Sequence, residues 1–286
     1  MYHFFYILFI SIIIYIITSC TQARNDEQKN KKKCRVSNKA DGKDKIEKVK
    51  VAGPLNAENF QASQKNILNN FNIRIRNHIS RYDLLKDEIS EQQDKYFNNY
   101  KNAASDTDRK VITENATHYI ISTITEKIFP FWYGTKWDFE GITETPLKGE
   151  IACGYFISTI MKHAGFNIER YKLAQQDAKS IIKTLCKHET IRSFSDINTY
   201  RNYLLNGPDG LYITGLDCHV GFIYKTGNSL FFIHSNYGYP QEVIKEDFDE
   251  SVVLHYSNSF YTGNISDNDN LIGKWINKEN IPTFIP

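Results

Sequence analysis

The spacing of apolar residues divides the chain into a helical part and a later strand-rich part. From Asn56 to about Lys127, apolar residues recur at intervals close to 3.6 residues, which is typical of amphipathic helices. A third helix in this region is expected to begin at a cap formed by Ser105 or Asp106. After Gly210 the period changes to two, which predicts strands. Helices followed by a run of antiparallel strands indicate an α+β fold.

The pattern between these parts is mixed. Pro130 and the aromatic residues around it are expected to end the helical region. A short helix is expected to begin at Cys153 and to end at a glycine cap, Gly165. Two further helices are expected at about 172–187 and 196–205. The expected strands are 211–214, 219–224, 230–235, 252–256 and 259–264.

The amino terminus has the pattern of an export signal. Residues 1–19 carry no Lys, Arg, Asp or Glu, and the apolar run from Phe4 to Ile17 is shorter than the roughly 20 residues of a membrane span. It ends in Ile17-Thr18-Ser19-Cys20, which resembles the lipobox of bacterial lipoproteins, whose cysteine carries lipid. An uncleaved membrane anchor is the alternative, since no basic residue precedes the run. Both interpretations export the body and attach it to a membrane.

Charge separates the next segment from the body. Residues 20–53 hold 11 Lys or Arg and 5 Asp or Glu, a net charge of +6, and they contain few aromatic residues. Such a composition cannot bury a core and predicts a flexible tether, either a solvated spacer or a segment lying on anionic lipid. The whole chain has a net charge of +2, which argues against a strongly basic nucleic-acid binder. We therefore expect a signal peptide at 1–19, a tether at 20–54, a helical region at 55–128 and an α+β domain at 129–286, whose candidate chemistry follows.

Cys153 is the candidate nucleophile. A cysteine in the first turn of a helix is favoured as thiolate by the helix dipole and the free amides, and a nearby imidazole would accept its proton. The Cys153 amide is placed to donate to a developing oxyanion, and Gly154 would allow a substrate backbone to approach closely. A buried structural cysteine is the alternative interpretation. Cys186 and Cys218 are expected in the core, and whether they form a disulfide is open.

Two histidines are expected to meet on a hairpin. If Tyr224 pairs with Ser229, alternation places His219 opposite His234 on one face of the sheet. A base beside a nucleophilic cysteine, oriented by a second polar group, follows the logic of a catalytic triad, with His219 as the base and His234 as the orienting residue. A metal site is the alternative for two histidines and a cysteine. The chain lacks the usual ligand spacings, so neither a metal nor a cofactor is expected.

These residues resemble a known enzyme family. A cysteine at a helix start, then His-Val-Gly-Phe-Ile-Tyr at 219–224 and Phe-Ile-His-Ser at 232–235, is similar to the NlpC-type cell-wall cysteine peptidases. The resemblance covers about residues 129–240 and implies a papain-like fold with Cys153, His219 and His234 as the catalytic residues. It also implies an oxyanion role for Tyr133, in Phe131-Trp132-Tyr133-Gly134. The family's Asp-Cys-Ser-Gly is replaced here by Ala152-Cys153-Gly154-Tyr155.

The sequence therefore predicts an exported, lipid-anchored cysteine hydrolase on the periplasmic side or at the cell surface. The resemblance implies that it cleaves an amide bond in the stem peptides of peptidoglycan through an acyl-enzyme. Its expected partners are that peptide and, through Cys20, a membrane. One alternative is the same fold acting on a protein or another amide, and another is a surface lipoprotein without enzymatic activity. The sequence does not indicate an oligomeric state.

Overall fold

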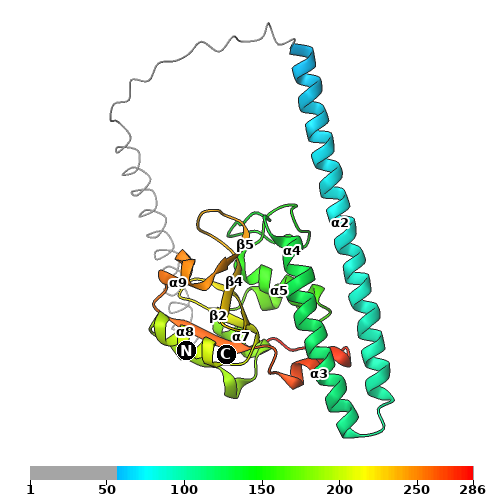
Figure 1. Ribbon diagram of the computed structural model, residues 1–286, viewed down its shortest axis with the longest axis vertical. Coiled ribbons are helices and arrows are strands. Elements are labelled where there is room, and N and C mark those ends of the chain that lie inside the picture. Colours follow the sequence, from blue (N-terminus) through cyan, green and yellow to red (C-terminus); the bar gives the residue numbers. More distant parts are fainter. Residues whose placement is uncertain (1–56, 286) are drawn as a thin grey trace, which may run out of the picture. The chain divides into compact units, whose positions relative to one another are not determined.

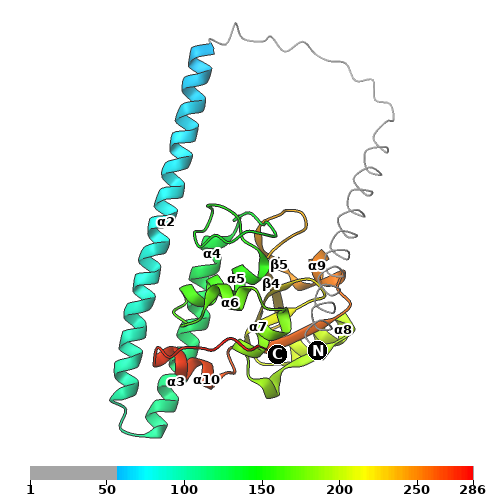
Figure 2. The same ribbon diagram turned by 180° about the vertical axis from the view of Figure 1, so that it is seen from behind.

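A computed structural model describes residues 57–285 of the chain (Figures 1 and 2). The predicted signal peptide, the lipid attachment at Cys20 and the tether lie outside the described residues. In chain order the helices are α2 (Ala57–Lys101), α3 (Asp106–Ser122), the π-helix η1 (Thr123–Ile128), α4 (Phe129–Trp132), α5 (Cys153–His163), α6 (Arg170–Ala174), α7 (Ala178–Leu185), η2 (His188–Thr190), α8 (Ile197–Asn206), η3 (Phe248–Glu250), α9 (Val252–His255) and α10 (Asp269–Ile276). The strands are β1 (Arg192–Phe194), β2 (Gly210–Gly215), β3 (Val220–Thr226), β4 (Ser229–Ser235), β5 (Val243–Asp247) and β6 (Phe260–Asn264).

The strands form one antiparallel sheet in the order β1-β6-β2-β3-β4-β5, which confirms the α+β class. Helices α5 and α7 pack on one face and α8 on the other, as Figures 1 and 2 show. Every residue of the central strand β2 is buried, because helices cover both of its faces. The sheet therefore separates two apolar cores.

Aromatic side chains seat α5 on the larger core. The ring of Phe156, in the first turn of α5, lies 6.2 Å from Phe129 and 6.0 Å from Phe222 of β3. Helices α2, α3 and η1 contribute Tyr82, Ile120 and other residues to the same core. The helical region that precedes residue 129 thus shares its core with the sheet.

The two helices expected before residue 105 are one continuous helix. Helix α2 runs for 45 residues, and its sequence contains neither glycine nor proline to interrupt it. Ser105 then caps α3, as expected, by accepting a hydrogen bond of 3.1 Å from the Asp108 amide. The helical path continues through Pro130 and ends at Trp132. Pro130 lies directly after the π-helix η1, at the point where the path changes from η1 to α4.

Three other expectations differ from the structure. The helix expected at 172–187 is two helices, α6 and α7, and Asp177 begins the second by capping its first turn. The strand expected at 252–256 is wrong, because Ser251 caps a short helix there, α9. Strands β1 and β5 and helix α10 were not predicted. None of the described helices is long and apolar enough to cross a membrane.

A buried hydrogen-bonded cluster joins α2 to the body. The Trp132 indole donates to the Tyr82 hydroxyl at 2.8 Å, and that hydroxyl lies 2.9 Å from His163 Nδ1. Further along α2, the Gln93 amide donates to the Trp275 carbonyl at 2.6 Å. These polar groups are buried, so each bond satisfies a group that water cannot reach.

We expect Tyr82→Phe to lower the free energy of unfolding by about 1–3 kcal/mol, because it leaves the buried Trp132 N–H without an acceptor. Urea denaturation measures this change. Tyr96→Phe is the matched control on the same helix. Its hydroxyl donates only to the Asn115 carbonyl near the surface, at 3.2 Å, and its loss is expected to cost about 0.5 kcal/mol. Equal effects of the two substitutions would contradict the buried-cluster interpretation.

Candidate active site

Helix α5 begins at Cys153, as the sequence predicts. Ala152 precedes it in an extended conformation (φ −79°, ψ 161°) and offers no side-chain oxygen to cap the first turn. The Cys153 side chain is half-buried against the larger core. The first-turn amides and the helix dipole thus act on a thiol that is not sealed inside the protein.

The other two residues predicted beside the oxyanion lie in different surroundings. Gly154 is buried, and a Cβ atom there would collide with the Ala174 carbonyl oxygen at the end of α6. The close approach of α5 and α6 therefore explains why residue 154 is glycine, without reference to a substrate. Tyr133 follows α4 and is half-buried, and this burial raises the pKa of its phenol to about 12.

The β3–β4 hairpin has a register two residues away from the expected one. Tyr224 pairs with Phe231 rather than Ser229, and Thr226 pairs with Ser229 across a two-residue turn. Gly227 occupies the first turn position with a φ of +56°, a conformation that favours glycine. An even shift leaves every side chain on its predicted face, so His219 and His234 still share one.

The two histidines are in direct contact. His219 Nε2 lies 2.8 Å from His234 Nδ1, and both rings are buried. His234 stacks on Phe232 with ring centroids 4.0 Å apart. A Cβ atom at Gly221 would overlap the Phe232 ring and lie only 2.9 Å from His234 Cβ. The glycine in the β3 sequence is therefore required for these rings to pack beside it.

Glu246 extends this pair, and the sequence analysis did not find it. His234 Nε2 lies 3.0 Å from Glu246 Oε1, and the same oxygen accepts a 2.5 Å bond from Ser251 Oγ. Glu246 pairs with Phe232 across β4 and β5, so it lies on the histidine face. The alternation of side chains around Glu246 could have placed it on the histidine face, but only if β5 had been recognised as a strand.

The hydrogen bonds define which nitrogens carry protons. An ionised Glu246 carboxylate only accepts, so His234 Nε2 must carry the hydrogen that lies toward it. In neutral His234, Nδ1 is then an acceptor, and His219 Nε2 donates to it. Neutral His219 is left with a lone pair on Nδ1. The array therefore presents a base at the nitrogen of His219 that faces away from His234.

The charges of the array favour these neutral rings. Burial, reinforced by the neighbouring His234, lowers the pKa of His219 well below its usual value. Burial also lowers the pKa of His234, although the Glu246 carboxylate partly offsets this. Burial acts to raise the pKa of Glu246, but hydrogen bonds from His234 and Ser251 outweigh it and leave the pKa below normal.

Cys153 and the histidine array lie at the same end of the sheet. Ser235 Oγ, one residue after His234, donates to the Ile151 carbonyl at 2.6 Å, two residues before Cys153. Helix α5 covers the sheet face opposite to the one that carries His234. His219 directly precedes β3 and so lies at the margin of the sheet. A contact between the Cys153 thiol and the His219 ring would therefore run around the strand ends rather than across one face of the sheet.

Aromatic residues on two joined loops lie beside His219. The ring of Tyr237 lies 5.2 Å from the His219 ring and 6.3 Å from Trp137. The Trp137 amide donates to the Gln241 carbonyl at 3.0 Å, which holds the two loops together. Phe139 and Tyr239 on these loops are strongly exposed. The Tyr237 ring therefore lies next to the rings of both His219 and Trp137.

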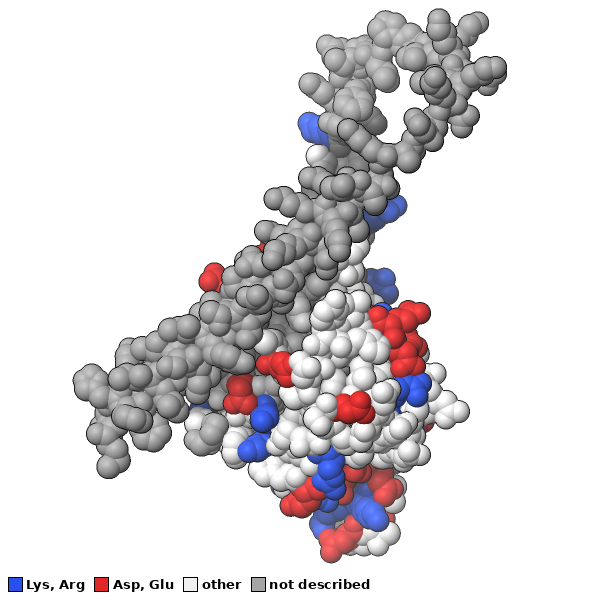
Figure 3. Space-filling model, turned by 90° about the vertical axis from the view of Figure 1, so that its left-hand side faces the viewer, with Lys and Arg blue, Asp and Glu red and all other residues white. Residues whose placement is uncertain are grey.

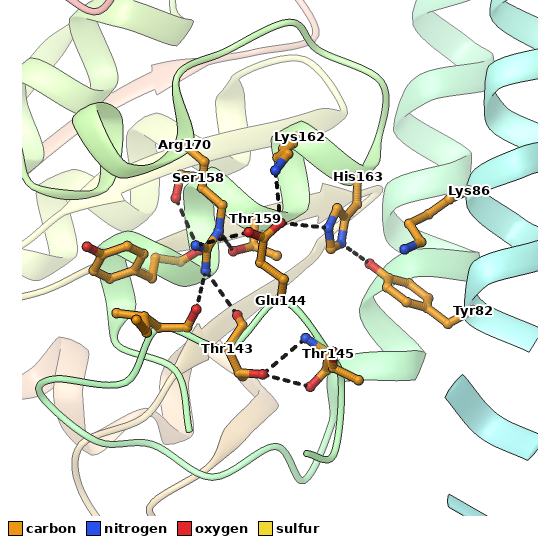
Figure 4. Close-up of polar contacts among 12 residues, drawn as sticks. Tyr82, Lys86, Thr143, Glu144, Thr145, Ser158, Thr159, Lys162, His163 and Arg170 are labelled. Atoms are coloured by element: carbon orange, nitrogen blue, oxygen red, sulfur yellow. Dashed lines mark hydrogen bonds and ion pairs between the residues drawn. The ribbon is translucent and has the colours of Figure 1, made fainter. Parts of the chain in front are cut away.

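A second polar cluster lies at the other end of α5 (Figure 4). The Glu144 carboxylate contacts Lys162 at 2.9 Å, Arg170 at 3.5 Å and His163 at 3.6 Å. Arg170 also donates to the Ile142 and Thr143 carbonyls. These bonds fasten the 138–150 loop to α5 and α6. We interpret the cluster as structural, because Glu144 binds side chains of α5 and α6 and Arg170 binds Glu144, Thr159 and two backbone carbonyls.

The cysteines and acids suggest no metal site. Among the residues that the structure describes, no group of three His, Cys, Asp or Glu side chains could hold an ion. Cys186 is buried against Gly263, and burial raises the pKa of its thiol. The expectation that Cys218 belongs to the core was wrong, because this residue is exposed.

Comparison with known proteins gives no relatives: no family model matches the chain, and neither do curated proteins or solved structures. The resemblance to the NlpC-type peptidases therefore rests on residues alone.

We expect Glu246→Gln to disturb the proton arrangement of both histidines. A glutamine amide can donate to His234 Nε2, which allows the reverse tautomer and places hydrogen on Nδ1 of each ring. Nitrogen NMR of the imidazoles at neutral pH distinguishes the tautomers. Glu242→Gln is the control, because the Glu242 side chain forms an ion pair with Lys136 at the surface. Unchanged tautomers in Glu246→Gln would contradict the role given to this carboxylate.

The second cluster makes stability depend on pH. Burial, with Lys86 nearby, lowers the pKa of His163 to about 4, whereas the unfolded chain takes up the proton near 6.5. The folded state therefore loses stability as pH falls from about 6.5 to 4, by up to about 3 kcal/mol from this residue. We expect His163→Gln to make the loss shallower in urea titrations across this window. Parallel curves for the two proteins would rule out this assignment.

Proposed function

We propose that this protein is an exported cysteine hydrolase of papain-like fold that cleaves an amide bond, with Cys153 as nucleophile and His219 as base. The observation that carries the proposal is the buried array His219–His234–Glu246, which ends in a basic nitrogen at the sheet margin. Helix α5 brings a half-buried cysteine in its first turn to the same end of the sheet. A nucleophile, a base and an orienting group are the minimum set for this chemistry.

The reaction follows from these roles. His219 Nδ1 takes the proton of the Cys153 thiol as sulfur attacks the substrate carbonyl carbon. First-turn amides of α5 donate to the oxyanion of the tetrahedral intermediate. The intermediate collapses, the C–N bond breaks, and the departing amine takes the proton from His219. Water then attacks the thioester while His219 accepts one of its protons, which releases the acid and restores the thiol.

Because His219 is buried, Glu246 has a definite role in this reaction. The low pKa of His219 keeps its ring neutral before reaction, so the base is available to accept a proton. During each transfer the ring becomes an imidazolium inside the protein, which is costly without a compensating charge. The Glu246 carboxylate, reaching through His234, stabilises that transient charge and holds the tautomer that exposes Nδ1.

The proposed substrate is a peptide of peptidoglycan. Its support is the residue resemblance at 219–224 and 232–235, together with the export and lipobox pattern at residues 1–20. Attachment through Cys20 would hold the enzyme at a membrane facing the wall. The face in Figure 3 intersperses acidic and basic side chains over the body, so it offers no extended basic surface for a nucleic acid.

We expect Cys153 to react with iodoacetamide at a pH well below the ordinary thiol pKa of about 8.5, and His219→Ala to shift that profile upward. Peptide release from peptidoglycan fragments should fall by at least about 10²-fold in His219→Ala and be lost in Cys153→Ser. Mass spectrometry and product analysis measure these effects.

Cys218→Ser is the matched control, because it removes the exposed cysteine next to His219 and should leave hydrolysis unchanged. Labelling of Cys153 only after unfolding would refute the catalytic role. If Cys153 is labelled rapidly and this depends on His219, but no wall peptides are released, then the hydrolase assignment stands and the substrate is a different amide.

A further inference from the structure

The first described turns of α2 expose large apolar side chains. Ile67, Leu68 and Phe71 have 65%, 61% and 59% of their surface exposed. Contacts of the helix with the body are in place from His78 onward, where Nε2 lies 2.8 Å from the Phe131 carbonyl oxygen. Residues 67–74 are all exposed. An apolar cluster of this size on one short segment is unusual for a surface that faces only water.

These three residues share one side of the helix. At about 100° per residue, Ile67, Leu68 and Phe71 fall within an arc of about 100°. Ile73 points to the opposite side and is 49% exposed. The same stripe continues toward the buried residues Tyr82 and Leu85. This part of α2 is therefore an amphipathic helix whose apolar side is buried at Tyr82 and Leu85 and exposed at Ile67, Leu68 and Phe71.

The charged residues near this arc are all basic. Between residues 59 and 82 the sequence contains Lys65, Arg74, Arg76 and Arg81 and no acidic residue. Arg74 and Arg76 are exposed, and by helical spacing Arg74 borders the apolar arc on one side while Arg76 lies about 80° beyond its other edge. The remaining exposed positions of this stretch are largely asparagine.

We propose that residues 67–76 of α2 bind the surface of a membrane rich in anionic phospholipid. In this arrangement Ile67, Leu68 and Phe71 enter the boundary between headgroups and acyl chains, and the flanking cations contact lipid phosphates. A helix with apolar residues on one side and Lys and Arg beside them has the chemistry of an interfacial segment. Each cation near an anionic surface adds to the attraction.

The charge and the apolar arc together favour lipid over other occupants. A second copy of the helix would bring like charges near each other around the shared apolar contact. A nucleic acid would use the cations but would leave the exposed Leu68 and Phe71 without a partner. The basic stretch at 20–53 immediately precedes this helix in the chain, so it would add charge of the same sign.

This inference extends the proposed membrane attachment and can fail independently of it. Attachment by Cys20 would keep the chain on a vesicle without any contact from α2. Contact by α2 would instead hold the start of the helix against the bilayer and limit how far the body can move from it. The readout must therefore be local to α2.

The test places a fluorescent reporter on each side of the helix. Full-length chains carrying Phe71→Trp or Ile73→Trp are added to vesicles of phosphatidylcholine alone or of equimolar phosphatidylcholine and phosphatidylglycerol, with brominated acyl chains. The spectrum of the unsubstituted chain is subtracted to remove the three native tryptophans. We expect the residue 71 reporter to shift to shorter wavelength and to be quenched on the anionic vesicles, whereas the residue 73 reporter stays in water.

Arg74→Gln combined with Arg76→Gln should reduce the quenching at residue 71, and so should added salt. Vesicle flotation of the same samples reports whether the chain is attached at all. Attachment without quenching at residue 71, or equal quenching at residues 71 and 73, overturns the inference while leaving the lipid anchor intact. A shift at residue 71 that grows with protein concentration in the absence of vesicles assigns the face to a second copy and likewise overturns it.

Discussion

Alternation of side chains across the sheet is the constraint on which the candidate site depends. Phe222 and Ile233 face α5 and close the larger core, so His219, His234 and Glu246 must face the other way. The alternating pattern of β3 and β4 therefore packs α5, which carries Cys153, against one face of the sheet and places the histidines and Glu246 on the other face. The same alternation places the proposed nucleophile and the proposed base on opposite faces, so they can approach each other only around the end of the sheet.

Burial then determines how the array works. A lone buried imidazole would be a neutral group with either tautomer available, and its protonation would be strongly opposed. Glu246 determines the tautomer, because an ionised carboxylate requires a hydrogen on the facing nitrogen of His234. The other nitrogen of His234 is then an acceptor, so His219 Nε2 must carry a hydrogen. Ser251 in turn supports the carboxylate from the start of α9. The pairing of β4 with β5 at the sheet edge thereby determines, through Glu246 and His234, which nitrogen of His219 carries a hydrogen.

The sequence predicted the parts of this site that depend on local pattern. The helix start at Cys153 and the shared face of His219 and His234 follow from periodicity, and the latter survived a register error because the error was even. Glu246 could not be found in the same way. Its role depends on β5, a five-residue strand with alternating exposed positions, and on its pairing with β4. Likewise, the glycine at 154 looked functional in the sequence, but its reason is a carbonyl brought near by α6, which no local pattern encodes.

The position of Cys153 depends on both ends of α5. At the first turn, Ser235 holds the Ile151 carbonyl, and the absence of a side chain at Gly154 lets α6 approach. At the last turn, His163 and Lys162 bind Tyr82 and Glu144, so the end of the helix is fastened to α2 and to the 138–150 loop. An eleven-residue helix held at both ends by buried polar bonds has little freedom to rotate about its axis. Since a small rotation would turn the thiol away from the sheet margin, α2 and the loop belong to the support of the proposed nucleophile, although neither supplies a reacting group.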